Sequence, residues 1–260
     1  MKIKSFINKV LVAKILRKVP QITVIFWIIK LLTTALGEST SDYLVHTINP
    51  VIAVIFGAIG FTITIILQIR ARKYIPWIYW LAVTMVAIFG TMTADVIHIV
   101  LGVPYLISTV GFIIILTIIF ITWYKVEKTL SIHSITTPRR ELFYWAAVIA
   151  TFALGTAAGD MTAITFNLGY LDSGIIFIVL FIIPLLIYGL THKYEVLTFW
   201  ASYIVTRPLG ASFADWFGRT KDLGGIGFGT GRTSVVLTAL IILFVFNISI
   251  KKESDRKNSK

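Results

Sequence analysis

The chain has 260 residues, of which 57% are hydrophobic and only 14% are charged. Ordinary soluble domains are roughly 45–50% apolar and about 25% charged, so this composition excludes a soluble globular protein. The absence of cysteine also excludes disulfides, iron–sulfur clusters and thiolate zinc sites.

The first predicted element is a basic amphipathic N-terminal segment, residues 1–19. Six of its residues are Lys or Arg, scattered among apolar side chains. It lacks the continuous apolar stretch and the small-residue cleavage site of a signal peptide. Two interpretations fit this pattern: a helix lying on the membrane surface, and a basic leader that only sets topology.

Eight apolar runs follow. A helix needs roughly 20 apolar residues to cross a hydrocarbon core about 30 Å thick. Runs of about this length lie near 20–37, 50–69, 76–95, 103–124, 143–160, 173–191, 196–214 and 233–250. They predict an all-α membrane protein with eight transmembrane helices in a single domain, residues 20–250. A polar cytoplasmic tail, residues 251–260, is expected to be frayed and exposed.

The net charge of +12 indicates orientation rather than nucleic-acid binding. With the N-terminus inside, 19 of the 24 Lys and Arg residues fall in cytoplasmic segments, four fall on the opposite side, and Lys30 lies within the first run. Because Lys and Arg accumulate in cytoplasmic loops, this asymmetry predicts that both termini are cytoplasmic (N-in/C-in). The bilayer is the expected partner, and the oligomeric state is not determined.

The odd-numbered runs share an internal repeat, in which an aromatic–Trp pair is followed by a glycine and then by a small residue and an aspartate. The glycine lies ten residues after the tryptophan, and the aspartate fifteen residues after it. The tryptophans are Trp27, Trp80, Trp145 and Trp200; the glycines are Gly37, Gly90, Gly155 and Gly210; and the aspartates are Asp42, Asp95, Asp160 and Asp215.

Each repeat contains one such patterned helix and one plain, almost purely apolar helix. The repeats cover approximately 20–72, 73–137, 138–193 and 194–250. Two spans return the chain to the same side, so the four copies are parallel and related by a pseudo-symmetry axis along the membrane normal. We expect the patterned helices to surround this axis and the plain helices to form an outer, lipid-facing ring.

With these residues the chain resembles a family of uncharacterised bacterial integral-membrane proteins, built from four tandem two-helix repeats that are each marked by a tryptophan. The resemblance covers essentially residues 20–250. It implies the eight-helix architecture and a multi-pass protein of the bacterial cytoplasmic (inner) membrane. It implies no activity.

Within one helix, the repeated Trp, Gly and Asp share one broad face. Glycines on such a face favour close packing of helices. The alternative is a break at each glycine that would free backbone groups to line a site. The tryptophans are more typical of packing near the inner interface than of stacking on a ligand.

The four aspartates are expected near the outer ends of their helices. Any one of them fits a solvated helix end, but four equivalent carboxylates near a membrane are unfavourable unless they are paired, hydrated or bound to a cation. Oxygen ligands suit Mg²⁺, Ca²⁺ or Mn²⁺. We therefore predict a shared metal or proton site formed by Asp42, Asp95, Asp160 and Asp215 with Glu38. No cofactor is identified, apart from a divalent cation as a possible substrate.

Departures from the repeat mark further candidates. Lys30 and Arg207 fall on the patterned face and are expected to pair with repeat carboxylates, either permanently or as partners released during transport. His98, three residues after Asp95, is either a ligand or proton carrier or simply a solvated histidine. The glycine-rich stretch 224–231 predicts a mobile or re-entrant loop rather than a nucleotide site.

The favoured function is a transporter or channel for a small cation, either a divalent metal or a proton-coupled cation. One alternative is an intramembrane enzyme, metal-dependent or acid–base, although four equivalent carboxylates suit a conduction axis better than an asymmetric active site. Another is a sensor or structural membrane protein in which the repeat is only a packing motif.

Overall fold

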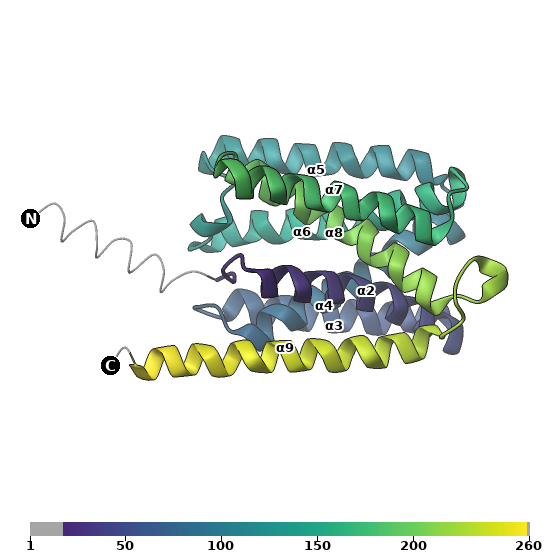
Figure 1. The fold of residues 1–260 in the computed structure, drawn as a ribbon, viewed down its shortest axis with the longest axis horizontal. Helices are drawn as coiled ribbons and strands as arrows, with labels where there is room; N and C mark the ends of the chain where they lie inside the picture. The colour runs from purple at the N-terminus through teal and green to yellow at the C-terminus, as the bar shows by residue number, and fades with distance from the viewer. Residues whose placement is uncertain (1–17, 259–260) are drawn as a thin grey trace, which may run out of the picture.

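The computed structural model describes residues 18–258, and this part of the chain is all-helical (Figure 1). The patterned helices are α2 (Val24–Thr47), α4 (Pro76–Asp95), α6 (Pro138–Asp160) and α8 (Glu195–Gly218). The plain helices are α3 (Pro50–Arg70), α5 (Tyr105–Glu127), α7 (Gly169–Thr191) and α9 (Thr230–Asn258). Short π-helices, η1 (Val96–Val100) and η3 (Met161–Thr165), extend α4 and α6, and single 3₁₀ turns occur at η2 (Ile132–Ser134) and η4 (Lys221–Leu223).

Six of the described helices are long and apolar enough to cross a membrane: α3, α4 with η1, α5, α6 with η3, α7 and α9. The chain is therefore a multi-pass membrane protein by length and composition. Helices α2 and α8 have similar lengths but contain several charged residues, among them Lys30, Glu38 and Arg207.

Several predicted boundaries were wrong. Helix α2 continues to Thr47, ten residues beyond the expected end at residue 37, because its polar second half is buried against other helices. Helix α9 continues through most of the tail that was expected to fray, and the Lys252 ammonium donates a hydrogen bond to the carbonyl of Tyr74. The tail residues are exposed through Ser254, as expected.

The predicted N-terminal surface helix lies outside the described residues except at its end. There, Lys18 is not helical and its side chain is buried. Its ammonium lies 2.5 Å from the Glu141 carboxylate, which also accepts a hydrogen bond from Gln68 at 3.0 Å. Lys18 therefore anchors the chain to the bundle rather than lying on a membrane surface.

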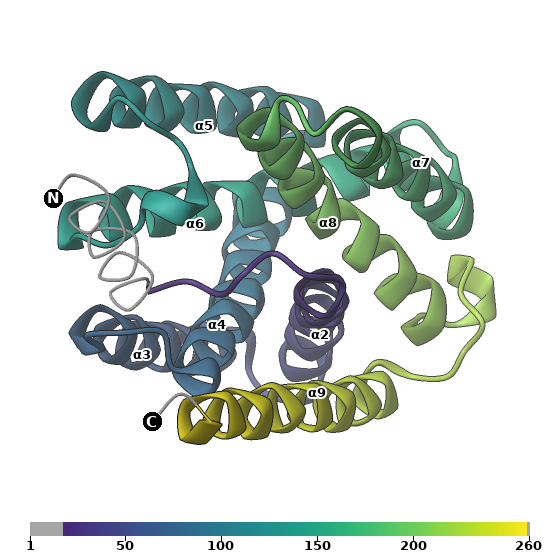
Figure 2. The same cartoon turned by 60° about the vertical axis from the view of Figure 1, so that its left-hand side comes forward.

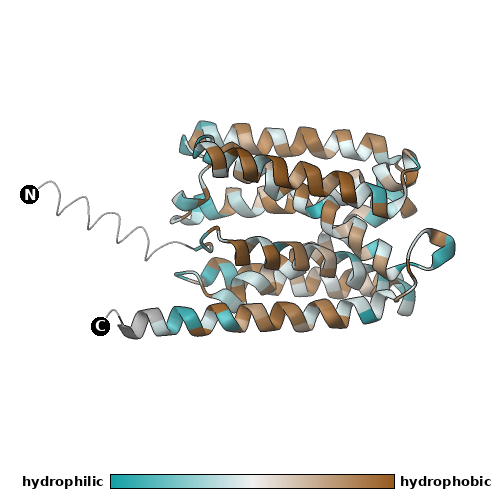
Figure 3. Cartoon of the chain, in the orientation of Figure 1, coloured by the Kyte–Doolittle hydropathy of each residue, from teal (hydrophilic) through white to brown (hydrophobic). Residues whose placement is uncertain are grey.

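The patterned helices form a closed ring in the order α2, α4, α6, α8, with α8 again beside α2 (Figure 2). Each plain helix packs mainly against the patterned helix of the following repeat: α3 on α4, α5 on α6, α7 on α8, and α9 on α2. The last repeat therefore completes the first. The plain helices are strongly hydrophobic along most of their length (Figure 3), which fits an outer position.

The aromatic–Trp pairs form a closed belt inside this ring. The first aromatic residue of each pair contacts the tryptophan of the next repeat, and the fourth repeat contacts the first. The ring centroids lie 5.7 Å apart in Phe26–Trp80, 5.7 Å in Tyr79–Trp145, 6.2 Å in Tyr144–Trp200 and 5.7 Å in Phe199–Trp27. Each such pair contributes about 0.5–1.5 kcal/mol beyond the area it buries, so the belt ties all four repeats together.

The repeat glycines form a second closed set of contacts. Each lies against the next patterned helix, at the residue three positions before that helix's own glycine. Gly37 faces Ala87, Gly90 faces Phe152, Gly155 faces Arg207, and Gly210 faces Thr34. All four helices run through their glycines without a break. The glycines therefore allow close approach of helices, and the alternative of a broken helix at each glycine is wrong.

This packing predicts that Gly210→Ala destabilises the protein. A methyl group at this position would overlap the Thr34 side chain and lie 2.9 Å from the backbone nitrogen of Ala35. Overpacking of this kind costs about 1–3 kcal/mol. Thermal unfolding in detergent should show a lower midpoint.

Gly111→Ala is the matched control, because a methyl group at Gly111 meets no atom within 4 Å. This change in α5 should leave stability unchanged or raise it by up to about 1 kcal/mol. Equal effects of the two substitutions would contradict the assignment of Gly210 to the helix contact.

Candidate functional site

Arg207 joins all four patterned helices at one level of the ring. Its side chain is 1% exposed. Nη2 donates to Glu38 Oε2 at 2.7 Å, to Thr156 Oγ1 at 2.9 Å and to Thr91 Oγ1. Nη1 donates to the carbonyl of Thr34 at 3.2 Å. The single arginine of α8 is thus held by α2, α4 and α6.

The partners of Arg207 occupy equivalent positions in the repeat. Glu38, Thr91 and Thr156 each directly follow a repeat glycine, and the fourth repeat has Ala211 there. Gly155 lies against the Cβ and Cγ atoms of Arg207, so its missing side chain leaves room for the stem of the arginine. The expected pairing of Arg207 is present, but its acidic partner is Glu38 rather than a repeat aspartate.

Lys30 is equally buried, with 1% of its surface exposed. The expected pairing of Lys30 with a carboxylate was wrong for the described residues. Its ammonium instead lies 4.0 Å from the ring centroid of Phe152 and 4.3 Å from that of Tyr203. Desolvated cation–π contacts are worth about 2 kcal/mol or more. Glu38 lies eight residues further along the helix, about 12 Å away, and is bound by Arg207.

Arg219 bridges two repeat aspartates at the end of the ring where α2 and α8 end. Its Nε lies 2.9 Å from Asp215 Oδ1, and its Nη2 lies 3.2 Å from Asp42 Oδ2. Partial burial by itself would lower the pKa of Arg219, but the carboxylates of Asp215 and Asp42 raise the pKa above its ordinary value. Arg219 therefore keeps its charge and neutralises part of this acidic end.

The glycine-rich stretch after Arg219 forms a compact loop. The backbone N–H groups of Ile226 and Gly227 donate to the carbonyls of Trp216, at 2.7 Å, and Arg219, at 2.9 Å. Gly224, Gly227 and Gly229 have positive φ angles, which only glycine adopts readily. The loop is thus built on the end of α8 and holds Arg219 beside the two aspartates.

Asp95 and Asp160 end α4 and α6, directly before the two π-helices. Among the described residues, neither carboxylate makes a hydrogen bond or an ion pair. Asp160 is 9% exposed and Asp95 is partly buried. The two interact electrostatically with each other, and Glu38 interacts electrostatically with all four repeat aspartates. The five acids thus share one region of the ring.

These acids do not form a cage for a metal ion. Within residues 18–254, no three Asp, Glu or His side chains are placed to hold one. Three of the five carboxylates face guanidinium groups instead, Glu38 on Arg207 and Asp42 and Asp215 on Arg219.

His98 stabilises the turn between α4 and α5. Its Nδ1 lies 3.0 Å from the carbonyl oxygen of Val103, its Nε2 lies 3.4 Å from Ser108 Oγ, and its ring contacts that of Tyr105. Neither nitrogen bonds to Asp95. One ring nitrogen has its neighbour in the turn and the other in the first turns of α5, so the structure favours a structural role over that of a ligand.

Sequence reasoning missed Arg219 and the threonines that bind Arg207. The spacing of Asp215 and Arg219, four residues apart, was a usable signal for an ion pair on one helix face. Thr91 and Thr156 were visible only as the repeat equivalents of Glu38. Their role follows from the ring, which brings positions from different repeats to one level.

The central ion pair predicts that Glu38→Gln strongly destabilises the protein. Removing one partner of a buried pair leaves an uncompensated charge, which costs about 3–5 kcal/mol. Unfolding in detergent with increasing denaturant should measure the loss. Glu195→Gln is the control, because Glu195 pairs with His133 in an exposed position, with side chains 45% and 36% exposed. Exposed pairs contribute about 0–1 kcal/mol. A loss no larger than in this control would refute the central role of Glu38.

The model of the family "Repeat of Unknown Function (DUF347)" matches the chain four times in tandem, over residues 25–74, 78–129, 143–194 and 198–253. The chain belongs to this family, and the four matches correspond one to one with the repeats predicted from the sequence. No curated protein and no solved structure matches the chain.

Proposed function

We propose that this member of the DUF347 repeat family is a proton-coupled carrier that moves a small cation across the bacterial cytoplasmic membrane. The observation behind the proposal is the pair Asp95 and Asp160, two equivalent carboxylates in the ring without an ionic partner among the described residues. Carboxylates in such a position are unfavourable unless they bind a cation or a proton. A small cation is therefore the ligand that this region suits best.

In this proposal all eight long helices span the membrane, and both termini are cytoplasmic. The start of α2 and the end of α9 lie at the same end of the bundle (Figure 1), which also carries the basic residues of the α3–α4, α5–α6 and α7–α8 turns. Helices α2 and α8 belong to the inner ring, and Lys30, Glu38 and Arg207 are buried there. Charged residues that face the interior of a bundle are compatible with a membrane span.

The arrangement of charge assigns different roles to the five acids. Arg207 compensates Glu38, and Arg219 compensates Asp42 and Asp215. Asp95 and Asp160 retain the capacity to bind a cation. Because no three acids in the described part of the chain are placed to hold a metal ion, a proton-coupled cation is favoured over a divalent metal held in a carboxylate cage.

Arg207 supports a carrier rather than an open channel. Its side chain crosses the ring from α8 and contacts α2, α4 and α6 at one level. A cation passing along the axis would meet this guanidinium. Transport therefore requires a second arrangement of the helices, whose population the bound cation shifts.

The proposal predicts that Asp95→Asn/Asp160→Asn impairs transport. Purified protein in liposomes with an imposed pH gradient should move a monovalent cation, followed by a pH-sensitive dye inside the vesicles and by the cation content. The double variant should lower the rate about tenfold or more, because it removes both carboxylates that bind the cation. A tenfold loss requires only about 1.4 kcal/mol of lost interaction.

Asp172→Asn is the matched control, since Asp172 is an exposed aspartate in the first turn of α7. It should transport like the unmodified protein. Full transport by the double variant would refute the assignment of Asp95 and Asp160 to the cation site. The absence of any cation flux through the unmodified protein, across a panel of alkali and divalent cations, would remove the proposed function.

A second prediction concerns Arg219. Arg219 competes with a cation for the acidic end of the ring. Arg219→Gln removes this charge from the neighbourhood of Asp160 and leaves Asp42 and Asp215 free to attract the cation. The cation concentration for half-maximal transport should therefore fall about fivefold, equivalent to about 1 kcal/mol. Arg232→Gln removes an exposed arginine near the same end and should have no such effect. An unchanged or higher half-saturating concentration in Arg219→Gln would contradict this competition.

A further inference from the structure

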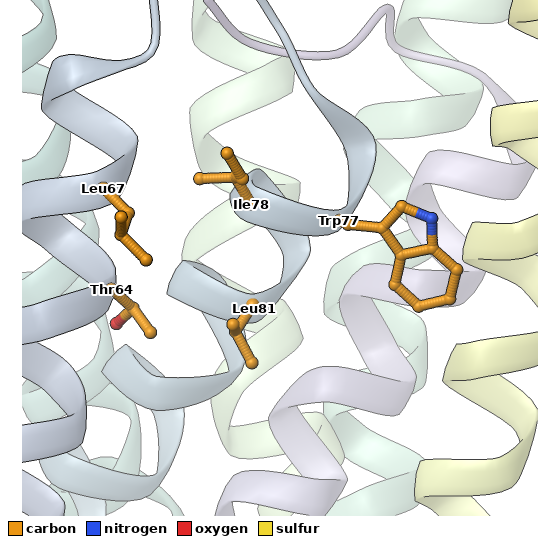
Figure 4. A pocket seen from close by; sticks show the side chains of 5 residues that line it. All are labelled: Thr64, Leu67, Trp77, Ile78 and Leu81. Atoms are coloured by element: carbon orange, nitrogen blue, oxygen red, sulfur yellow. The ribbon is translucent and has the colours of Figure 1, made fainter.

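A shallow apolar groove lies between α3 and α4, outside the ring. Thr64 and Leu67 on α3 and Ile78 and Leu81 on α4 line it, with Trp77 beside them on α4 (Figure 4). The Thr64 hydroxyl donates to the carbonyl of Gly60 at 2.9 Å, so it adds no unpaired polar group. The groove suits an apolar chain and no polar ligand.

The groove begins beside a turn with unpaired positive charge. Arg70, Arg72 and Lys73 connect α3 to α4, and all three are exposed. Among the described residues, none of them makes an ion pair. Arg70 lies six residues after Thr64, so the groove extends about 9 Å along α3 from the basic turn.

A fourth cation reaches this turn from α9. Lys252 donates a hydrogen bond to the carbonyl of Tyr74, and its ammonium lies 4.5 Å from the centroid of the Tyr74 ring. Lys73 and Lys252 also influence each other electrostatically. Like charges gathered in this way repel one another, and an anion placed between them would relieve the repulsion.

The corresponding turn of the second repeat is different. Arg139 and Arg140, at the start of α6, both pair with the Glu127 carboxylate, at 2.5 and 2.6 Å. The preference for positive charge at the cytoplasmic end applies to both turns, so topology alone does not distinguish them. The α3–α4 turn differs because it contains no acidic residue, its cations have no ion pair among the described residues, and it adjoins an apolar groove.

We propose that the α3–α4 groove and the basic turn at its end form a binding site for an anionic phospholipid. One acyl chain lies in the groove against Leu67 and Leu81. The headgroup phosphate lies at Arg70, Arg72 and Lys73. Basic clusters at the membrane surface attract anionic lipids. Tryptophan favours the membrane–water interface, and Trp77 would lie at that depth beside the headgroup.

A phospholipid is the occupant because it combines both features of the site. A soluble anion would use the basic turn but leave the groove unused. An apolar helix of a partner protein would use the groove but not the charge. The lipid belongs to the leaflet at the end where α2 starts and α9 ends, and its binding does not depend on the proposed transport.

Quenching of Trp77 fluorescence tests the site. The protein is placed in nanodiscs of phosphatidylcholine that contain increasing fractions of brominated phosphatidylglycerol or, in parallel, of brominated phosphatidylcholine. The signal of Trp77 is the difference between the unmodified chain and Trp77→Phe. Half-maximal quenching should need an about tenfold lower mole fraction of the anionic lipid than of the neutral lipid.

Two triple variants separate a site from a general attraction to charge. Arg70→Gln/Arg72→Gln/Lys73→Gln should abolish the preference. Lys125→Gln/Lys128→Gln/Lys193→Gln removes three exposed basic residues from the other turns at the same end and should retain it. Equal quenching by both lipids overturns the proposal. So does a preference that survives in the first variant or that the second variant loses.

Discussion

A guanidinium group buried among four helices persists only if each neighbouring helix supplies a partner. Arg207 is 1% exposed, and its hydrogen bonds reach α2, α4 and α6 from α8. The acceptors Glu38, Thr91 and Thr156 occupy one position of the repeat, and Gly155 makes room for the stem of the arginine. The hydrogen bonds of Arg207 therefore require all four patterned helices to be aligned at this level, and they stabilise that alignment.

The ring that provides this register is held by contacts that repeat from copy to copy. Each aromatic residue lies against the next tryptophan, and each glycine lies against the next helix. The plain helices also link one repeat to the next, because each covers the patterned helix of the following repeat. No repeat is then complete without its neighbour, which is the general condition for a repeat that cannot bury its own apolar face.

Charge along the ring follows from the differences between the copies. Lys30 and Arg207 lie among aromatic and hydroxyl side chains in the ring, whereas the aspartates lie near the C-terminal ends of the patterned helices. Arg219, on the loop after α8, neutralises two of these aspartates. In the two copies in the middle of the chain, Asp95 and Asp160 have no such ionic partner within the described part of the chain. A pseudo-symmetric frame thus contains an asymmetric distribution of charge, which is where we place the proposed carrier's site.

The sequence alone determined the helical membrane class and the four repeats, and it favoured close approach at the glycines. These features are local or periodic. The length of an apolar run indicates a membrane-spanning helix, and residues that recur at a fixed spacing indicate equivalent environments in each repeat. The sequence also identified Arg207 and Glu38 as unusual residues, because each departs from its repeat. It misassigned Lys30, since an intramembrane lysine gives no indication that its neighbours will be the rings of Phe152 and Tyr203.

Only the tertiary structure decided which residues meet. Phe152, Tyr203 and Lys30 belong to three different repeats, and so do Glu38, Thr91 and Thr156 around Arg207. Their contacts depend on how far each helix is rotated and shifted against the next. Close packing over whole helix faces sets this rotation and shift, and neither can be read from a single position in the sequence. The sequence therefore determined the repeated frame, and the packing of four copies around one axis decided its charged interior.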